Sequence, residues 1–124
     1  MNKQFRQIIC FGCGALVSDR EGPTHPYMLS SPGCWKLYGE ILAKEYTLVN
    51  YDLDTHRITV DTYALTYPGI KERRAIQSVY IHLISLFYTF EKEMSGIQTT
   101  QILKSVVENK NIANAFLWLE PPQF

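Results

Sequence analysis

Hydrophobic residues recur at helical spacing over most of the chain after residue 30, whereas only short apolar runs precede that point. Gln7-Ile8-Ile9 and Ala15-Leu16-Val17 flank a glycine-rich turn, and this pattern predicts two short strands of a hairpin. The next segment, from Asp19 to Pro26, is made of turn residues and has no apolar period, so we expect a loop.

Four helices are predicted beyond this loop, at about residues 32–46, 56–67, 71–94 and 100–109. Ser30 or Ser31 is a suitable N-cap for the first helix, and Pro32 suits its first position. Pro68-Gly69 is expected to end the second helix, and Gly96 to end the third. Residues 112–119 form an apolar tail that must pack against the rest of the protein.

Each predicted helix has one apolar face, and these faces define the expected core. His56 heads the face of the second helix, and His82 lies beside that of the third. Asp61 lies off its stripe, next to Arg57 and Leu65, and is expected to be solvated or salt-bridged. The faces consist of Trp35, Tyr38, Ile41, Leu42 and Tyr46, then His56, Val60, Tyr63, Ala64 and Tyr67, then Ile76, Val79, Tyr80, Leu83, Phe87, Phe90 and Met94, and finally Ile102, Leu103, Val106 and Val107.

The fold class that follows is mainly α, a small helical bundle with an N-terminal zinc-knuckle β-hairpin. At 124 residues the chain is expected to be a single domain spanning 1–124. Within it, residues 7–30 form the knuckle and loop, 31–110 the helical bundle and 111–124 the C-terminal tail.

Charge and hydropathy exclude several classes of partner. Twelve basic residues balance twelve acidic ones, which argues against nucleic-acid binding through a strong positive field and against a polybasic membrane anchor. The longest apolar stretch, residues 76–90, is shorter than the roughly 20 residues that span a bilayer. No signal-peptide pattern is present, so we expect a reducing, bacterial-style cytoplasm and an unidentified protein or small-molecule partner.

All three cysteines lie in the first 34 residues. Cys10 and Cys13 form a CxxC motif, in which Gly12 and Gly14 permit the positive φ of a tight turn. Cys34 falls at the start of the first predicted helix, where the backbone dipole favours a thiolate. An odd number of cysteines in a reducing compartment is typical of metal binding rather than of a disulfide, and thiolates are preferred zinc ligands.

The fourth ligand is left open by spacing alone. His25 gives a Cys-x2-Cys-x11-His-x8-Cys order, which is acceptable for zinc. His56 faces inward at the start of the second helix, but it reaches Cys34 only if the connecting loop folds that start back. His82 is either a hydrogen-bonded core histidine or a residue in the first or second shell of the metal.

Two interpretations compete with metal binding. Cys10 and Cys13 could be small buried hydrophobic residues at a turn. They could instead form a thiol redox pair, but such a motif normally opens a helix, and Ala15-Leu16-Val17 does not resemble a helix start.

Several motifs resemble a family of small, uncharacterised bacterial proteins, described as a domain of unknown function. The motifs are CxxCGA at 10–15, GPTHxYM at 22–28, SPGCW at 31–35 and HRxTVDxYA at 56–64. The resemblance implies that His56, rather than His25, is the fourth ligand. The family pattern often reads Gln-His-Pro where this chain has Thr66-Tyr67-Pro68, so one histidine is missing here.

The sequence therefore predicts a zinc-binding protein with a structural site of three cysteines and one histidine, formed by Cys10, Cys13, Cys34 and His56. A closed site contributes folding energy and leaves no place for a substrate, which favours a binding or scaffold module. The alternative is a metal-dependent enzyme with an open zinc position. In that case His82, Asp61 or Glu45 would transfer protons.

Overall fold

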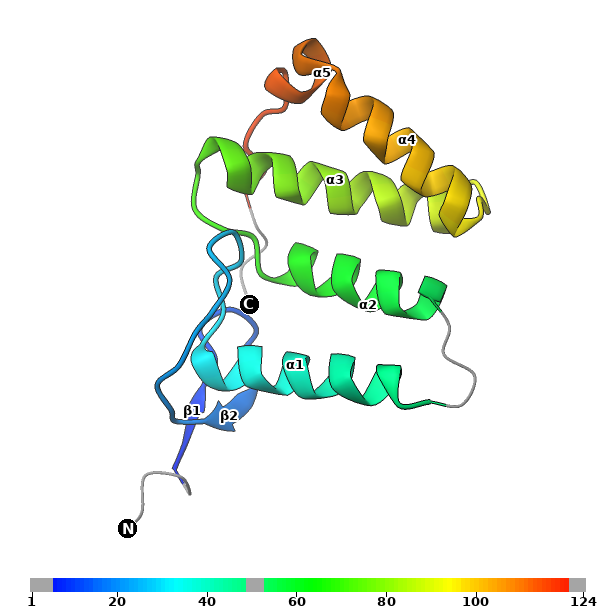
Figure 1. Ribbon diagram of the computed structural model, residues 1–124. Coiled ribbons are helices and arrows are strands. Elements are labelled where there is room, and N and C mark those ends of the chain that lie inside the picture. The colour runs from blue at the N-terminus through cyan, green and yellow to red at the C-terminus, as the bar shows by residue number, and fades with distance from the viewer. Residues whose placement is uncertain (1–5, 49–52, 121–124) are drawn as a thin grey trace.

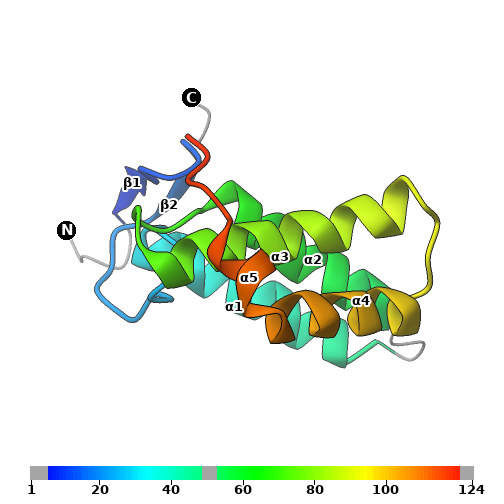
Figure 2. The same cartoon turned by 90° about the horizontal axis from the view of Figure 1, so that it is seen from above.

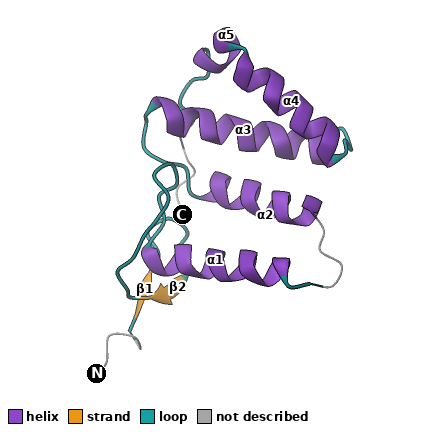
Figure 3. Cartoon of the chain, in the orientation of Figure 1, coloured by secondary structure: helices purple, strands orange, loops and turns teal. Residues whose placement is uncertain are grey.

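The computed structural model describes residues 6–48 and 53–120. Within these residues the chain forms a mainly helical fold with an N-terminal two-stranded hairpin, which confirms the predicted fold class (Figures 1 and 3). The elements are β1 (Gln7–Ile9), β2 (Leu16–Ser18), α1 (Pro32–Tyr46), α2 (Leu53–Thr66), α3 (Arg73–Phe90), α4 (Gly96–Glu108) and α5 (Lys110–Asn114).

The helices stack in chain order. α1 packs against α2, α2 against α3, and α3 against α4, and successive helices of the first three run in opposite directions (Figure 1). Seen from above, the segment after α5 crosses the first part of α3 and runs toward the hairpin (Figure 2). α2 therefore lies in the middle of the stack and contacts a helix on each side.

The hairpin is joined to the start of α1. The antiparallel strands pair Ile8 with Val17, and Val17 is buried. β2 packs against α1, and Gly33 makes the close approach possible, because a Cβ at this position would collide with the Ser18 backbone. This contact fixes the position of Cys34, the next residue of α1, relative to the turn between the strands.

The boundary between α3 and α4 differs from the prediction. α3 ends at Phe90, and Glu93 has a φ of 52°, a left-handed conformation that a helix cannot contain. Ser95 and Gln98 form a capping box, so α4 begins at Gly96, the residue expected to end the preceding helix. The Ser-x-x-Gln pattern in the sequence was the signal for this start.

Two further expectations need correction. α2 begins at Leu53, three residues before the predicted start. The sequence predicts a connector over residues 49–54, of which 49–52 lie outside the described residues. Asp61 was expected to be solvated or salt-bridged: it is salt-bridged, to Arg57 and His82, but it is only 4% exposed and therefore not solvated. The prediction assumed one buried face per helix, whereas α2 buries a second face against α3.

The predicted apolar tail, residues 112–119, begins within the short helix α5, and beyond this helix Phe116 stacks on Tyr80 of α3 with ring centroids 4.3 Å apart. Among the described residues, no helix has both the length and the apolar character needed to cross a membrane.

Candidate metal site

The turn between β1 and β2 presents Cys10 and Cys13 from one tight loop. The Cys10 backbone N–H donates to the Ala15 carbonyl, and the Gly14 N–H donates to the Cys10 carbonyl, both at 2.8 Å. Gly14 has the expected positive φ, at 77°. Gly12 does not adopt a positive φ. It is needed because a Cβ there would lie 2.6 Å from the Tyr67 ring.

The structure brings Cys34 to this turn. Its sulfur and those of Cys10 and Cys13 all lie within 4.8 Å of one another. Two Zn–S bonds of about 2.3 Å at a tetrahedral angle place their sulfurs about 3.8 Å apart. The three side chains therefore need to move by only about an ångström to hold one ion.

The surroundings favour a thiolate at Cys10. Burial by itself raises the pKa of a thiol, but Cys10 also accepts hydrogen bonds from the Ser31 hydroxyl and from the backbone N–H groups of Ser31, Gly12 and Cys13. Together these contacts lower its pKa from 9.0 to about 6. Cys34 behaves differently, because burial, reinforced by its proximity to Cys10, raises its pKa.

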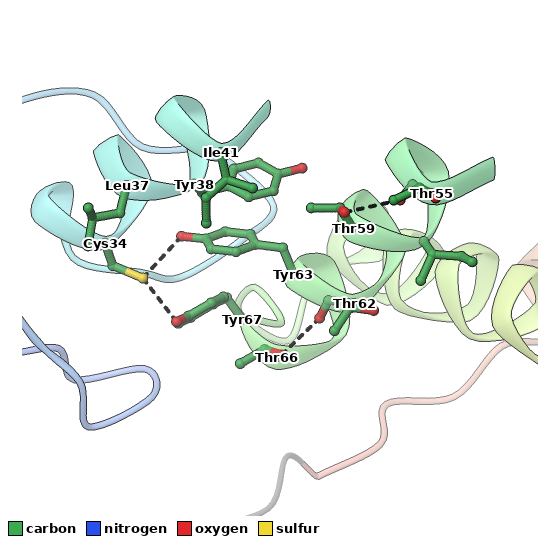
Figure 4. Close-up of a pocket in the computed structure, with 11 residues that line it drawn as sticks. Cys34, Leu37, Tyr38, Ile41, Thr55, Thr59, Thr62, Tyr63, Thr66 and Tyr67 are labelled. Carbon is green, nitrogen blue, oxygen red and sulfur yellow. Dashed lines mark hydrogen bonds between the residues drawn. The ribbon is translucent and has the colours of Figure 1, made fainter. Parts of the chain in front are cut away.

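Two tyrosines, Tyr63 in the last turn of α2 and Tyr67 directly after the helix, point at Cys34 (Figure 4). The Cys34 thiol donates a hydrogen bond to the Tyr67 hydroxyl at 2.9 Å, and the Tyr63 hydroxyl donates to Cys34 at 3.4 Å and to Ser30 at 2.8 Å. Tyr67 is also hydrogen-bonded to Cys13. Burial is the main cause of the raised pKa of both phenols, so both remain protonated next to the thiols.

The donor set fits a thiophilic ion. Cys10 and Cys34 are buried, at 1% and 7% exposure, so a thiolate there loses most of its contact with water. The Ser31 hydroxyl beside Cys10 is fully buried and has no oxygen or nitrogen partner in the described part of the chain. The Cys10 sulfur is the acceptor beside this hydroxyl, and a thiolate accepts more strongly than a thiol; a cation stabilises such buried thiolates.

A pocket of about 540 Å³ adjoins this group between α1 and α2 (Figure 4). Aromatic packing borders it, since the Tyr38 and Tyr63 rings stack at 3.9 Å. The lining residues are Cys34, Leu37, Tyr38, Ile41, Thr55, Ile58, Thr59, Thr62, Tyr63, Thr66 and Tyr67.

His56, predicted as the fourth ligand, is not brought to the sulfurs. Its Nδ1 lies 3.0 Å from Glu45 Oε2, and its Nε2 lies 3.2 Å from the Tyr46 hydroxyl. α1 and α2 are antiparallel, so the start of α2 lies beside the end of α1 (Figure 1). The ten residues from His56 to Thr66 span about 15 Å of helix, which separates His56 from Cys34.

The other two histidines also lie elsewhere. His25 accepts a hydrogen bond from the Tyr27 backbone N–H at 3.0 Å and packs against Trp35. His82 lies on α3 with its Nδ1 2.7 Å from Asp61 Oδ1, and it does not line the α1–α2 pocket. Across residues 6–48 and 53–120, the three sulfurs form a group without a histidine or carboxylate.

Sequence reasoning missed the role of the tyrosine hydroxyls. Tyr63 and Tyr67 were assigned to the core face of the second helix as apolar residues. Their spacing of four residues, directly before Pro68, places both hydroxyls at the end of α2, which is the end that meets the start of α1.

Comparison with known proteins identifies a family but no characterised relative. A model described as a family of unknown function (DUF5946) matches residues 8–124. No curated protein and no solved structure matches the chain.

Proposed function

Because the chain belongs to this family of unknown function (DUF5946), we propose its function from the sulfur group itself: Cys10, Cys13 and Cys34 bind one zinc ion with a structural role. The ion joins the β1–β2 turn to the start of α1 and so holds the hairpin on the helical stack. The protein is then a binding or scaffold module that works in a reducing compartment such as the cytoplasm.

The convergence of three sulfurs from two separate segments carries this proposal. Free cysteines are often buried as small apolar residues, but they have no reason to gather with their sulfurs facing one another. Zinc binds thiolate ligands in closed tetrahedral sites, and its binding contributes to the free energy of folding. The enzyme alternative is less well supported, because His82 is hydrogen-bonded to Asp61 and lies outside the pocket next to Cys34.

The proposal is tested by the zinc content and thermal stability of the purified protein. We expect one zinc ion per chain in the wild type and loss of zinc in Cys34→Ser. Zinc at 100 times its Kd should stabilise the wild type by about 2.7 kcal/mol, because it binds only the folded state. Calorimetry with and without a chelator measures this difference, and Cys34→Ser should not respond to zinc.

His56→Ala tests whether His56 is a zinc ligand, as predicted from the sequence, or lies outside the site, as its position in the structure indicates. It should retain zinc, because its ring is bonded to Glu45 and Tyr46. His25→Ala is the matched control from the loop. A wild type that carries no zinc after purification and reconstitution, or whose transition is unchanged when zinc is demonstrably removed, contradicts the structural role.

A further inference from the structure

The phenol of Tyr67 reaches the sulfur group from a third segment, apart from the two that carry the cysteines. Its oxygen is 2.9 Å from the Cys34 sulfur and is also hydrogen-bonded to Cys13. We propose that Tyr67 is the fourth ligand of the metal, which makes the site one of three cysteines and one tyrosine. This inference rests on the proposed zinc site and names the group that completes it.

The distances suit a ligand. With a Zn–S bond of about 2.3 Å and a Zn–O bond of about 2.0 Å, a sulfur and an oxygen on one tetrahedral ion lie about 3.5 Å apart. The Tyr67 oxygen is already closer than this to Cys34, and no protein group separates them (Figure 4). An ion entering among the three sulfurs therefore pushes the phenol outward slightly and remains in contact with it.

The ring is held in this position from two sides. The Gly12 backbone lies against one edge, so close that a Cβ there would be 2.6 Å from Cδ1 and 2.8 Å from Cε1 of Tyr67. The Tyr63 ring packs nearby, with ring centroids 4.3 Å apart. Tyr67 is 6% exposed, so its hydroxyl cannot swing into solvent without opening the turn.

The charge of such a site is one that proteins tolerate. Three thiolates and one phenolate around zinc carry the same net charge as the four thiolates of a structural site built from four cysteines. Here the negative charge faces the backbone N–H groups of Gly12, Cys13 and Ser31, as well as the first turn of α1. These N–H groups stabilise the negative charge of the ligands.

The binding step involves no oxidation. A coordinate bond forms between the phenolic oxygen and the zinc ion, the O–H bond breaks, and the proton passes to solvent, as do the protons of the remaining thiols. A Lewis-acidic ion bound to the oxygen supplies the stabilisation that the buried phenol lacks in the metal-free protein.

Tyr67→Phe tests the assignment, because it removes the oxygen and keeps the ring. Zinc affinity is measured by chelator competition, and the visible spectrum is recorded with Co²⁺ bound in place of zinc. We expect zinc affinity to fall by at least about 10-fold, a loss already typical of weaker contacts around a metal. The Co²⁺ bands should change in position and intensity, because water replaces the phenolate.

Tyr63→Phe is the matched control. It removes a neighbouring hydroxyl that bonds to Cys34 and Ser30 but does not bind the metal, so it should lower zinc affinity less than Tyr67→Phe does and leave the Co²⁺ bands in place. Equal affinity and identical bands in Tyr67→Phe and wild type overturn the assignment, as does an equal loss in both variants. In either case the zinc site itself stands as long as Cys34→Ser abolishes binding, whereas failure of the wild type to bind metal removes the proposed function as well.

Discussion

Two buried polar clusters lie at different places in the stack, and their charges are balanced in different ways. At the hairpin end, three thiols converge with tyrosine and serine hydroxyls, and no histidine or carboxylate belongs to the group as the described residues define it. Between α2 and α3, the buried Asp61 carboxylate accepts from His82 at 2.7 Å and from the Ser85 hydroxyl, with Arg57 3.9 Å away.

In the Asp61 cluster, the negative charge is balanced by side chains of the protein itself. Arg57 extends it by donating to Ser85 at 2.9 Å and Thr89 at 2.8 Å, so the carboxylate has a cation, a histidine and a hydroxyl around it. Around the sulfur group, the described residues contribute hydroxyl and N–H donors but no histidine or carboxylate. If the proposed zinc ion binds the sulfurs, the two clusters differ in where the balancing charge comes from, namely side chains at Asp61 and the ion at the thiolates.

The first prediction sharpens this contrast. Asp61→Asn removes the negative charge and leaves Arg57 and His82 facing an amide. We expect a loss of about 3 kcal/mol in the free energy of unfolding, at the lower end of the range for broken buried pairs. The reason is that the Arg57 and His82 side chains remain 18% and 19% exposed. Urea unfolding with and without zinc should give the same loss.

Glu40→Gln is the control for Asp61→Asn. It makes the same carboxylate-to-amide change in the exposed Lys36–Glu40 pair, where we expect less than about 0.5 kcal/mol. A loss in Asp61→Asn that disappears when zinc is removed would show that the two clusters are coupled. It would contradict the independence of the Asp61 cluster from the sulfur group.

The second prediction concerns pH in the metal-free protein. Hydrogen bonds at Cys10 lower its pKa to about 6 in the folded state, compared with an ordinary value of 9.0. The folded state therefore loses this proton first and gains stability as the pH rises from about 6 to 9. Below about pH 6 both states are protonated and the gain is absent.

We expect the stability difference between metal-free wild type and Cys10→Ser to grow over this window by up to about 1.4 kcal/mol per pH unit. Urea titrations from pH 5 to 9 measure it. A flat difference across the window would mean that the Cys10 environment does not favour a thiolate, and the sulfur group would then lose its distinction from an ordinary buried cluster.

The smallest effect is expected at a position outside both clusters. Ser95→Ala removes the capping box of α4 and should cost about 1 kcal/mol in the free energy of unfolding. Calorimetry should give the same decrease with and without zinc, and zinc content should be unchanged. Altered zinc binding in this variant would indicate that the metal site depends on the whole helical stack.

Much of the fold was accessible from the amino-acid sequence. The Ser-Pro start and the apolar period predicted α1 over the residues it occupies, 32–46. The CxxC spacing and a third cysteine at that helix start predicted that the three sulfurs would meet, as they do. These features depend on residue types and their spacing along the chain, and both can be read from the sequence.

The remaining features depend on how the helices are arranged. A periodic pattern shows which face of α2 is apolar, but not which end of α2 meets Cys34, so His56 was preferred over the tyrosines at the opposite end. The pattern also favours one buried face, so the position of Asp61 between α2 and α3 was missed. The sequence pattern predicts Tyr67 as an apolar core residue, because the contact of its hydroxyl with the Cys34 sulfur depends on how α1 and α2 pack.

The separation of Cys34 from the CxxC pair has a consequence for biosynthesis. A growing chain exposes Cys10 and Cys13 well before Cys34 is made, and Tyr67 follows later still. Two thiols alone retain an ion weakly, so tight capture waits until the first helix has started and the second has ended. Metal uptake would then mark the completion of this corner of the protein rather than initiate it.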